Sequence, residues 1–375
     1  MTIPFLDLPV QHVALKQELM QVFSDALDSA GFIGGPVVKA FEEDFAAFVG
    51  TKHSVGVANG TDALQLALVA MGVKEGSRVV TVPNTFIATT EAISQAGARI
   101  DFVDIDPETC LMDPNRLEEH LKRRFAGPRV DWPSAIIPVH LYGQCADMDG
   151  VLSLARQYDL LVLEDAAQAH GATYKGKSAG TMGHAAAFSF YPGKNLGACG
   201  EAGAVTTNDS VIAEKVAMFR DHGQSTKYYH AIEGCNSRLD AIQAGFLRVK
   251  LPHLARWNAL RQQVADAYNF AFGGVDWIRL TKVRPNNTSS HHLYVIHTRQ
   301  RDQFREHLNK NGIATGLHYP LPLHLQECYA HFELKRGSFP EAERSADELL
   351  SLPMFPELGL DRARQVIDSV LAFRA

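Results

Sequence analysis

The sequence has 375 residues, of which 46% are hydrophobic and 21% are charged, and its formal net charge at pH 7 is −6. This composition is typical of a globular protein with a substantial core, and the length predicts one large domain and one smaller domain. The acidic balance, without any basic run, argues against a nucleic-acid partner. No apolar run approaches the roughly 20 residues that span a bilayer, so a membrane partner is not expected either.

The cysteines and the N-terminus indicate a reducing compartment. Five cysteines are scattered along the chain, and none forms a C-x-x-C pair, which argues against both a zinc site and a disulfide framework. We therefore expect no metal site. Residues 1–8 lack the basic stretch and the following apolar stretch of a secretory signal peptide. These features together predict a cytoplasmic protein.

A strand followed by a glycine turn and a helix appears early in the chain. Residues 53–58 predict a short buried strand, and residues 63–71 predict a helix. The turn between them places free backbone N–H groups and the positive end of a helix dipole at one point, which suits a phosphate group. Gly60 and Thr61 are therefore candidate phosphate-binding residues. The alternative, commoner on spacing alone, is that Thr61 or Asp62 only caps the helix.

Short apolar strands and helices alternate over the next hundred residues. Strands are predicted over residues 78–82, 98–103, 135–139 and 160–163, with helices between them. This alternation predicts an α/β fold with a mainly parallel sheet covered by helices on both faces. Ligands of such sheets lie at the carboxyl ends of the strands. One site could therefore collect the five residues that follow apolar runs: Gly60, Phe86, His140, Asp165 and Lys194.

Asp165 follows the apolar run Leu161-Val162-Leu163 with only Glu164 between them. A carboxylate buried there without a partner would be costly, so it needs a cation, and a pyridinium nitrogen would serve. The ordinary alternative is an aspartate that caps the next helix.

Lys194 stands on a tight turn after a strand-like run, residues 185–190, that ends in Pro192-Gly193. Aromatic residues flank the turn, and a lysine in such surroundings can lose its water shell and become nucleophilic. A lysine that forms a Schiff base needs this environment. The alternative is a surface lysine in a hairpin turn.

The composition changes near Gly273, where short strands, prolines and asparagines replace a long helix. We place a domain boundary there, between a large domain of residues 1–272 and a small α+β domain of residues 273–375. In the small domain, a strand is predicted over residues 291–297, a helix over 301–311, a strand end over 317–320 and a helix over 342–350.

Six motifs follow one another along the chain. They are Asn59-Gly60-Thr61-Asp62-Ala63-Leu64, Pro83-Asn84-Thr85-Phe86-Ile87-Ala88-Thr89, Glu164-Asp165-Ala166-Ala167-Gln168, Ser189-Phe190-Tyr191-Pro192-Gly193-Lys194-Asn195-Leu196, Gly234-Cys235-Asn236-Ser237-Arg238-Leu239-Asp240, and His318-Tyr319-Pro320 with His324. In this order the motifs resemble the DegT/StrS family of sugar aminotransferases, which have the fold-type-I pyridoxal-phosphate architecture. The resemblance covers essentially the whole chain.

The resemblance implies a role for each cofactor residue. Lys194 would carry pyridoxal 5'-phosphate (PLP) as a Schiff base and later move protons, and Asp165 would hold the pyridine nitrogen protonated. Gln168 would contact the ring hydroxyl and Phe86 would stack on the ring. Gly60, Thr61 and Ser189 would bind the phosphate, and Asn236 would reach the phosphate of a neighbouring subunit in a homodimer with shared active sites. Without the resemblance, each of these residues has an ordinary structural interpretation. Gln168 would be a residue on a helix surface and Phe86 a core residue. Ser189 would be a hydroxyl residue of a strand, and Asn236 would cap a helix.

The resemblance also implies the reaction. An amino acid, expected to be L-glutamate, would convert PLP to pyridoxamine 5'-phosphate (PMP), and a nucleotide-linked keto-sugar would then accept the amino group. Relatives with histidine in place of the lysine are dehydratases, so Lys194 favours transamination. The residues around Pro192-Gly193-Lys194 resemble the branch that aminates C-3 of a 3-keto-6-deoxyhexose, here expected to be linked to dTDP. Glu201 is a mild departure from that branch, which usually has aspartate in this position.

Five further residues are candidates for substrate binding: Tyr191, Lys227, Tyr228, His318 and His324. The cationic and aromatic loop at Lys227 and Tyr228 could contact a nucleotide or could be a solvated surface loop. A lone histidine is more often a structural residue.

Two alternatives to the 3-aminotransferase remain open. One is a C-4 aminotransferase on a UDP-, dTDP- or GDP-linked 4-keto sugar or on a keto-cyclitol. The other is a non-catalytic sensor that keeps the fold and the cofactor, against which the set of Lys194, Asp165, Gln168 and Asn236 argues. A plain dinucleotide-binding module is disfavoured because no G-x-G-x-x-G follows the first strand.

Overall fold

The computed structural model describes residues 2–373. Its main sheet has seven strands in the order β1-β9-β8-β5-β4-β2-β3. These strands are β1 His53–Val57, β2 Arg78–Thr81, β3 Arg99–Phe102, β4 Pro133–Ile136, β5 Leu161–Asp165, β8 Ala185–Ser189 and β9 Gly203–Thr207. Strand β9 pairs antiparallel with both neighbours, and the remaining pairings are parallel, so β9 alone runs against the others. The mainly parallel α/β sheet is confirmed.

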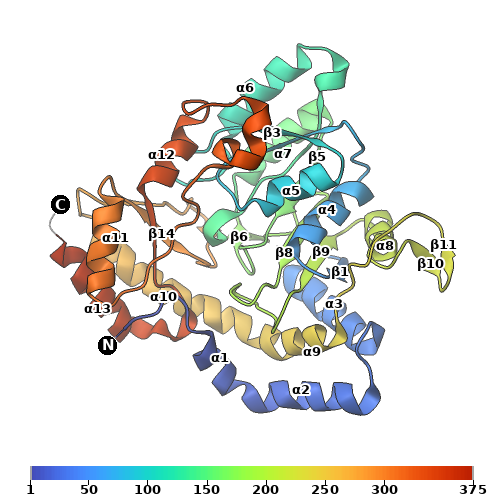
Figure 1. Cartoon of the computed structure of the whole chain (residues 1–375), viewed down its shortest axis with the longest axis horizontal. Helices are drawn as coiled ribbons and strands as arrows, with labels where there is room; N and C mark the ends of the chain where they lie inside the picture. The colour runs from blue at the N-terminus through green and yellow to red at the C-terminus, as the bar shows by residue number, and fades with distance from the viewer. Residues whose placement is uncertain (1, 374–375) are drawn as a thin grey trace.

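Helices cover both faces of this sheet (Figure 1). One face packs against α3 Gly35–Val49, α6 Pro114–Phe125, α7 Met148–Tyr158 and α9 Ala241–Lys250. The other packs against α4 Gly60–Ala70, α5 Ala88–Gln95 and α8 Ser210–Phe219.

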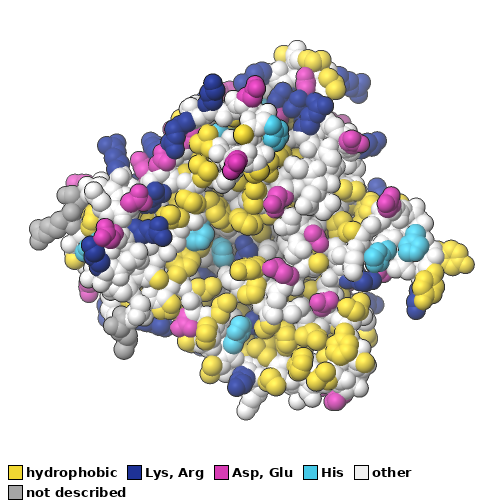
Figure 2. Space-filling view, in the orientation of Figure 1, with side chains coloured by type: hydrophobic (Ala, Val, Ile, Leu, Met, Phe, Trp, Pro, Cys, Tyr) yellow, Lys and Arg dark blue, Asp and Glu magenta, His cyan; other side chains and the backbone are white. Residues whose placement is uncertain are grey.

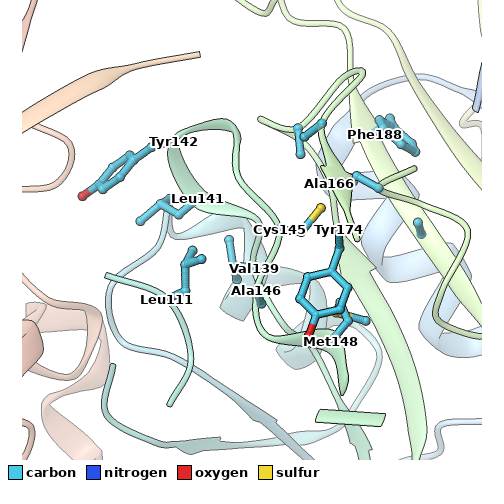
Figure 3. Close-up of a cluster of buried hydrophobic side chains, with 14 of the residues drawn as sticks. Leu111, Val139, Leu141, Tyr142, Cys145, Ala146, Met148, Ala166, Tyr174 and Phe188 are labelled. Carbon is cyan, nitrogen blue, oxygen red and sulfur yellow. The ribbon is translucent and has the colours of Figure 1, made fainter. Parts of the chain in front are cut away.

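Consecutive residues of these strands are apolar. Because successive side chains of a strand point to opposite faces, both faces of the sheet are therefore apolar. Val80 and Val162 belong to the first core, whereas their chain neighbours Val79 and Leu163 belong to the second. Figure 3 shows part of the first core, where the side chains of Val139, Cys145 and Tyr174 gather beneath the carboxyl ends of the strands.

The N-terminal segment forms two helices, whereas the apolar pattern of its sequence predicts a single amphipathic helix over residues 13–29. Helix α1 covers Leu8–Ala14 and α2 covers Lys16–Ser29, with a break at Leu15. The Asp7 carboxylate caps α1 by accepting from the amide of Val10, so the helical region starts earlier than the apolar pattern suggested. Helix α2 runs beside α9 along the lower edge of Figure 1.

The C-terminal part has its own three-stranded antiparallel sheet. It contains β12 Arg279–Leu280, β14 Tyr294–His297 and β15 Leu349–Leu352, packed with α10 Leu254–Phe272, α11 Arg301–Lys310 and α13 Gly359–Ala372. Helix α12 covers Pro340–Glu348. The same core includes Ile3 and the second half of α10, which the predicted boundary at residue 272 assigned to the large domain. The division into residues 1–272 and 273–375 stays a prediction.

Two predictions for the C-terminal part were wrong, and one helix was missed. Residues 317–320 form no strand, although the adjacent Gly316 bridges Ser351. The predicted helix 342–350 ends at Glu348 because the apolar residues after it belong to β15. The last helix, α13, was not predicted.

Two small β-structures complete the chain. Strands β6 Thr173–Tyr174, β7 Lys177–Ser178 and β13 Asn287–Thr288 form one sheet, and β10 Gln224–Thr226 with β11 Tyr229–His230 forms a hairpin. The hairpin projects from the right of the molecule in Figure 1. Within residues 2–373, no helix is both long and apolar enough to cross a membrane.

Candidate active site

A cavity of about 860 Å³ lies at the carboxyl edge of the main sheet. The five residues predicted to share a site all line it: Gly60, Phe86, His140, Asp165 and Lys194. They come from segments that follow β1, β2 and β4, from the end of β5, and from the turn after β8. The parallel order of these strands brings their ends to one edge, as the sequence predicted.

Lys194 stands on a turn that the backbone holds closely. Its amide donates to the carbonyl of Tyr191 at 2.8 Å, and the amide of Ala198 donates to the carbonyl of Phe190 at 2.8 Å. A Cβ atom on Gly197 would lie 2.3 Å from the carbonyl oxygen of Pro192, so only glycine fits there. Burial lowers the pKa of the Lys194 amine to about 8, although the charge of Asp165 acts in the opposite direction. The amine is therefore much more nucleophilic near neutral pH than an exposed lysine.

Asp165 is buried at the end of β5, where its carboxylate accepts two hydrogen bonds. Thr89 Oγ1 donates to Oδ2 at 2.7 Å, and the amide of Ala167 donates to Oδ1 at 3.2 Å. Burial raises the pKa of the Asp165 carboxyl, while both hydrogen bonds and the charge of Lys194 oppose the rise. A cationic ring nitrogen beside this carboxylate would favour its ionised form.

The neighbouring Glu164 points away to a separate buried network. Its carboxylate accepts from His140 Nε2 at 2.9 Å and from the amides of Gly180, Met182 and Gly183. These donors and the His140 partner hold the pKa of Glu164 below its usual range in spite of burial. The network fixes the strand end from which Asp165 projects.

The N-terminus of α4 forms an anion-binding cradle. Asn59, rather than Thr61 or Asp62, caps the helix: its side chain accepts from the amide of Asp62 at 2.9 Å. Within residues 2–373, no hydrogen bond engages the amides of Gly60 and Thr61. A Cβ atom on Gly60 would lie 2.5 Å from Cβ of Ser189, so the glycine lets β8 and its hydroxyl approach the helix end closely. Free amides, a helix dipole and a nearby hydroxyl suit a phosphate.

Gln168 and Phe86 both lie beside Tyr319 in the cavity wall. Gln168 accepts from the amide of Tyr142 at 2.7 Å and donates to the hydroxyl of Tyr319 at 3.2 Å. The rings of Phe86 and Tyr319 are 5.6 Å apart. Phe86 is 53% exposed, so it is a cavity-wall residue and not a core residue.

Two of the five predicted substrate-binding residues line the cavity, Tyr191 and His318. The ring of His318 stacks on Phe5 at 5.5 Å, and its Nδ1 lies 2.8 Å from Oγ of Ser351. Burial lowers the pKa of His318 to about 4, so the ring is neutral at pH 7. Glu201, the departure from the 3-aminotransferase branch, also lines the cavity.

The remaining three do not line this cavity. His324 is buried beside Glu343, with 3.0 Å between Nε2 and Oε1, because that buried carboxylate needs a donor. Lys227 and Tyr228 lie on the exposed β10–β11 hairpin, where the ammonium is 5.2 Å from the ring centre. Asn236 is also exposed outside the cavity, in a short bridge with Asp221.

Sequence reasoning missed four cavity residues: Thr89, Arg261, His292 and Tyr319. Thr89 and Tyr319 were inside quoted motifs but had no assigned role, whereas no motif marked Arg261 or His292. His292 Nδ1 is 3.1 Å from Asn195 Oδ1, next to the lysine turn. Among the described residues, no group of three or more His, Cys, Asp or Glu side chains is placed to hold a metal ion.

The comparisons with known proteins agree with this geometry. The model of the DegT/DnrJ/EryC1/StrS aminotransferase family matches residues 13–371. A pleiotropic regulatory protein of Geobacillus stearothermophilus is 44% identical over 375 residues, covering 100% of this chain and 99% of the relative. A dTDP-3-amino-3,6-dideoxy-alpha-D-galactopyranose transaminase of Aneurinibacillus thermoaerophilus is 40% identical over 368 residues, covering 98% of each.

A solved structure, that of S. venezuelae DesV in complex with a ketimine intermediate, is 42% identical with a TM-score of 0.95, covering 100% of this chain and 99% of that one. Matches of this extent leave no large part of the chain outside the comparison. The chain therefore belongs to the DegT/DnrJ/EryC1/StrS aminotransferase family and is a PLP-dependent aminotransferase.

Proposed function

We propose that this chain transfers the amino group of L-glutamate to a dTDP-linked 3-keto-6-deoxyhexose, with Lys194 as the residue that binds PLP and moves protons. The observation that carries the proposal is the single cavity in which Lys194 and Asp165 meet the cradle at the α4 N-terminus. When bound, PLP supplies an electron sink for the negative charge left after proton removal.

The chain offers a partner for each end of the cofactor. We assign its phosphate to the free amides of Gly60 and Thr61 and to the Ser189 hydroxyl, its ring nitrogen to Asp165, and its ring hydroxyl to Gln168. Phe86 would cover one face of the ring. Lys194, released as a free amine, would hold the proton that moves between the two carbon atoms flanking the transferred nitrogen. Its lowered pKa suits this work because a general base acts best near the operating pH.

The substrate is inferred from the relatives and from the cavity. The Aneurinibacillus relative is named for an amino group at C-3 of a dTDP-linked sugar. Tyr191 and His318 line the cavity and are our candidates for sugar contacts. A panel of dTDP- and UDP-linked 3-keto and 4-keto sugars tests this choice by the rate of amination. Preferred turnover of a 4-keto sugar would replace our proposal by the C-4 alternative. No turnover of any keto-sugar would favour the non-catalytic alternative, in line with the name of the 44% identical relative, a pleiotropic regulatory protein.

We also infer that two copies of the chain form a dimer with shared active sites. Met20, Phe23 and Leu27 repeat at helical spacing on α2 and are 57%, 42% and 56% exposed. Figure 2 shows hydrophobic side chains gathered along the lower edge of the molecule, where Figure 1 places α2. In the proposed dimer, Asn236 and the β10–β11 hairpin with Lys227 and Tyr228 would reach the cavity of the partner.

Mixing two inactive variants tests the shared site. We expect Lys194→Ala and Asn236→Ala dimers to be nearly inactive alone and to regain activity after subunit exchange, because one site of the mixed dimer then carries both native residues. As the control, each variant is taken through the same exchange procedure alone. If no activity returns although mass spectrometry detects mixed dimers, Asn236 does not act across the interface.

Replacing Gly60 by alanine should weaken PLP binding. The new Cβ would lie 2.5 Å from Cβ of Ser189, so α4 and β8 must separate at the phosphate cradle. Overpacking of this kind costs about 1–3 kcal/mol, which corresponds to roughly tenfold to a hundredfold in affinity. Fluorescence titration of the apoenzyme with PLP measures the effect. Gly274→Ala, where nothing lies within 4 Å of the added atom, is the matched control and should bind PLP normally.

Replacing Thr89 by valine should lower kcat about tenfold to a hundredfold, because a hydrogen bond to a charged group contributes about 1.5–3 kcal/mol. Without this donor the pKa of Asp165 rises further, and the carboxyl becomes protonated at a higher pH than in the wild type. The acid limb of the kcat/KM profile should therefore move to higher pH.

Thr89→Ser keeps the hydroxyl and should restore both kcat and the position of the acid limb of the kcat/KM profile. Thr90→Val is the neighbouring control, since that hydroxyl contacts Ile87 and Tyr329 instead. An unchanged pH profile in Thr89→Val would show that the hydrogen bond does not tune Asp165.

A further inference from the structure

A second cavity, of about 530 Å³, lies along the edge strand β3 of the main sheet. Its lining includes Arg78 and Arg99, the first residues of β2 and β3, whereas the active-site cavity begins beyond the other end of β2. The two cavities have no lining residue in common. The second cavity is completed by the C-terminal end of α6 and by residues 331–339.

A network of guanidinium groups forms one side of this cavity. The buried carboxylate of Asp101 accepts from Arg78 at 3.0 Å, from Arg124 at 2.7 Å and from His120 Nε2 at 3.0 Å. Nδ1 of His120 accepts from Arg123 at 3.1 Å, because a guanidinium can only donate. The network therefore gathers three arginine side chains around Asp101 and His120.

The balance of charge in the cavity is positive. Four arginines line it, Arg78, Arg99, Arg123 and Arg124, and in the described part of the chain two carboxylates contact them, Asp101 and Asp131. Within residues 2–373, Arg99 and Arg123 have no carboxylate partner, and the buried Nε of Arg124 has no hydrogen-bond acceptor. The cavity thus holds donors and positive charge that the chain itself does not satisfy.

An aromatic wall, formed by Phe102, Phe332 and Phe339, also lines this cavity. The ring of Phe102 meets Phe339 at 5.9 Å and Phe332 at 6.3 Å, both nearly edge to face. Figure 2 shows Lys and Arg side chains gathered near the top of the molecule, in the region of α6 and β3, with hydrophobic side chains below them. Favourable interaction with the α6 dipole accounts for basic residues at the C-terminus of that helix. It accounts neither for Arg99 on β3 nor for the aromatic wall.

We propose that this second cavity binds a nucleoside phosphate, with the phosphates against Arg99, Arg123 and Arg124 and the planar base against the phenylalanine wall. Guanidinium groups bind phosphate oxygens through paired, charge-assisted hydrogen bonds, and aromatic rings stack on bases. The site is separate from the one that takes the keto-sugar nucleotide and does not depend on the identity of that substrate.

Isothermal titration of the PLP-loaded enzyme with ADP tests the proposal. We expect Arg99→Gln/Arg123→Gln to weaken ADP binding about tenfold or more, because both lost groups donate to phosphate and neither contacts Asp101. Arg116→Gln is the matched control on the same helix: its partner is Glu119, it lies outside the cavity, and ADP binding should be unchanged. Adenosine, which lacks phosphates, should bind far more weakly than ADP.

Equal ADP affinity in the wild type and the double variant would overturn the proposal, as would undetectable binding to the wild type. If the double variant fails to fold, hydrogen exchange of the wild type decides the question. ADP should slow exchange in the last turn of α6 and in residues 331–339. Protection confined to the segments around Lys194 would overturn the proposal.

Discussion

Lys194→Ala should reduce the rate of transamination by about 10⁴-fold or more. Positioned general acid–base catalysis alone contributes about 10²- to 10⁴-fold, and this variant also loses the amine that binds the cofactor covalently. Alanine cannot replace either function, and among residues 2–373 of the same chain no second lysine lines the cavity. The measurement is the rate of amino-sugar formation at saturating PLP, L-glutamate and keto-sugar.

The control for Lys194→Ala is Lys175→Ala. Lys175 is exposed and pairs with Asp149 on the surface, so its removal should leave the rate nearly unchanged. Lys194→Arg adds a second comparison, because it retains a positive charge without a nucleophilic amine and should be as inactive as the alanine variant. A Lys194→Ala rate within tenfold of the wild type would show that another group moves the proton.

Asp165→Asn should have the second largest effect, a loss of about 10²- to 10⁴-fold in kcat/KM. Removing one partner of a buried charge pair costs about 3–5 kcal/mol, and each 1.4 kcal/mol corresponds to a factor of ten. The asparagine amide matches the shape of the carboxylate and can still contact Thr89, so the protein should fold. It cannot stabilise a positive charge on a ring nitrogen. Steady-state kinetics with a folded, PLP-loaded variant measure the loss.

Asp165→Glu separates charge from position. It restores the carboxylate with one additional methylene and should recover part of the activity lost in Asp165→Asn. If Asp165→Asn keeps its kcat/KM within threefold of the wild type, the buried carboxylate is only a structural element of β5. That result would also remove the role we assign to Thr89.

The alternation of apolar strands and helices was sufficient to predict the sheet and the edge at which the site lies. Strands buried on both faces have a continuous apolar sequence, and their carboxyl ends meet at one edge. Gly60, Asp165 and Lys194 were therefore predicted to meet although they are far apart in the chain, and they line one cavity. The reversed direction of β9 could not be predicted, because an apolar strand of this length fits either orientation.

Contacts between distant segments explain what the sequence did not reveal. His324 was assigned to the sugar pocket, but its partner Glu343 lies on α12 and binds it inside the protein. Thr89 contacts Asp165 from α5, 76 positions away, and no local pattern marks a threonine as a partner of a buried carboxylate. Residues 349 and 350 were predicted as the end of a helix because their pairing with β14 depends on a strand more than 50 residues earlier.

The most direct test of the account is the visible absorption spectrum of the purified protein before and after addition of L-glutamate, beside Lys194→Ala. In the wild type we predict a band of the lysine-bound cofactor that L-glutamate bleaches and that a dTDP-linked 3-keto-6-deoxyhexose then restores. In Lys194→Ala no glutamate-dependent conversion should occur. A wild-type protein that takes up no added PLP, or whose spectrum is unaffected by L-glutamate and keto-sugar, would contradict the assignment of Lys194 and Asp165 as the catalytic pair.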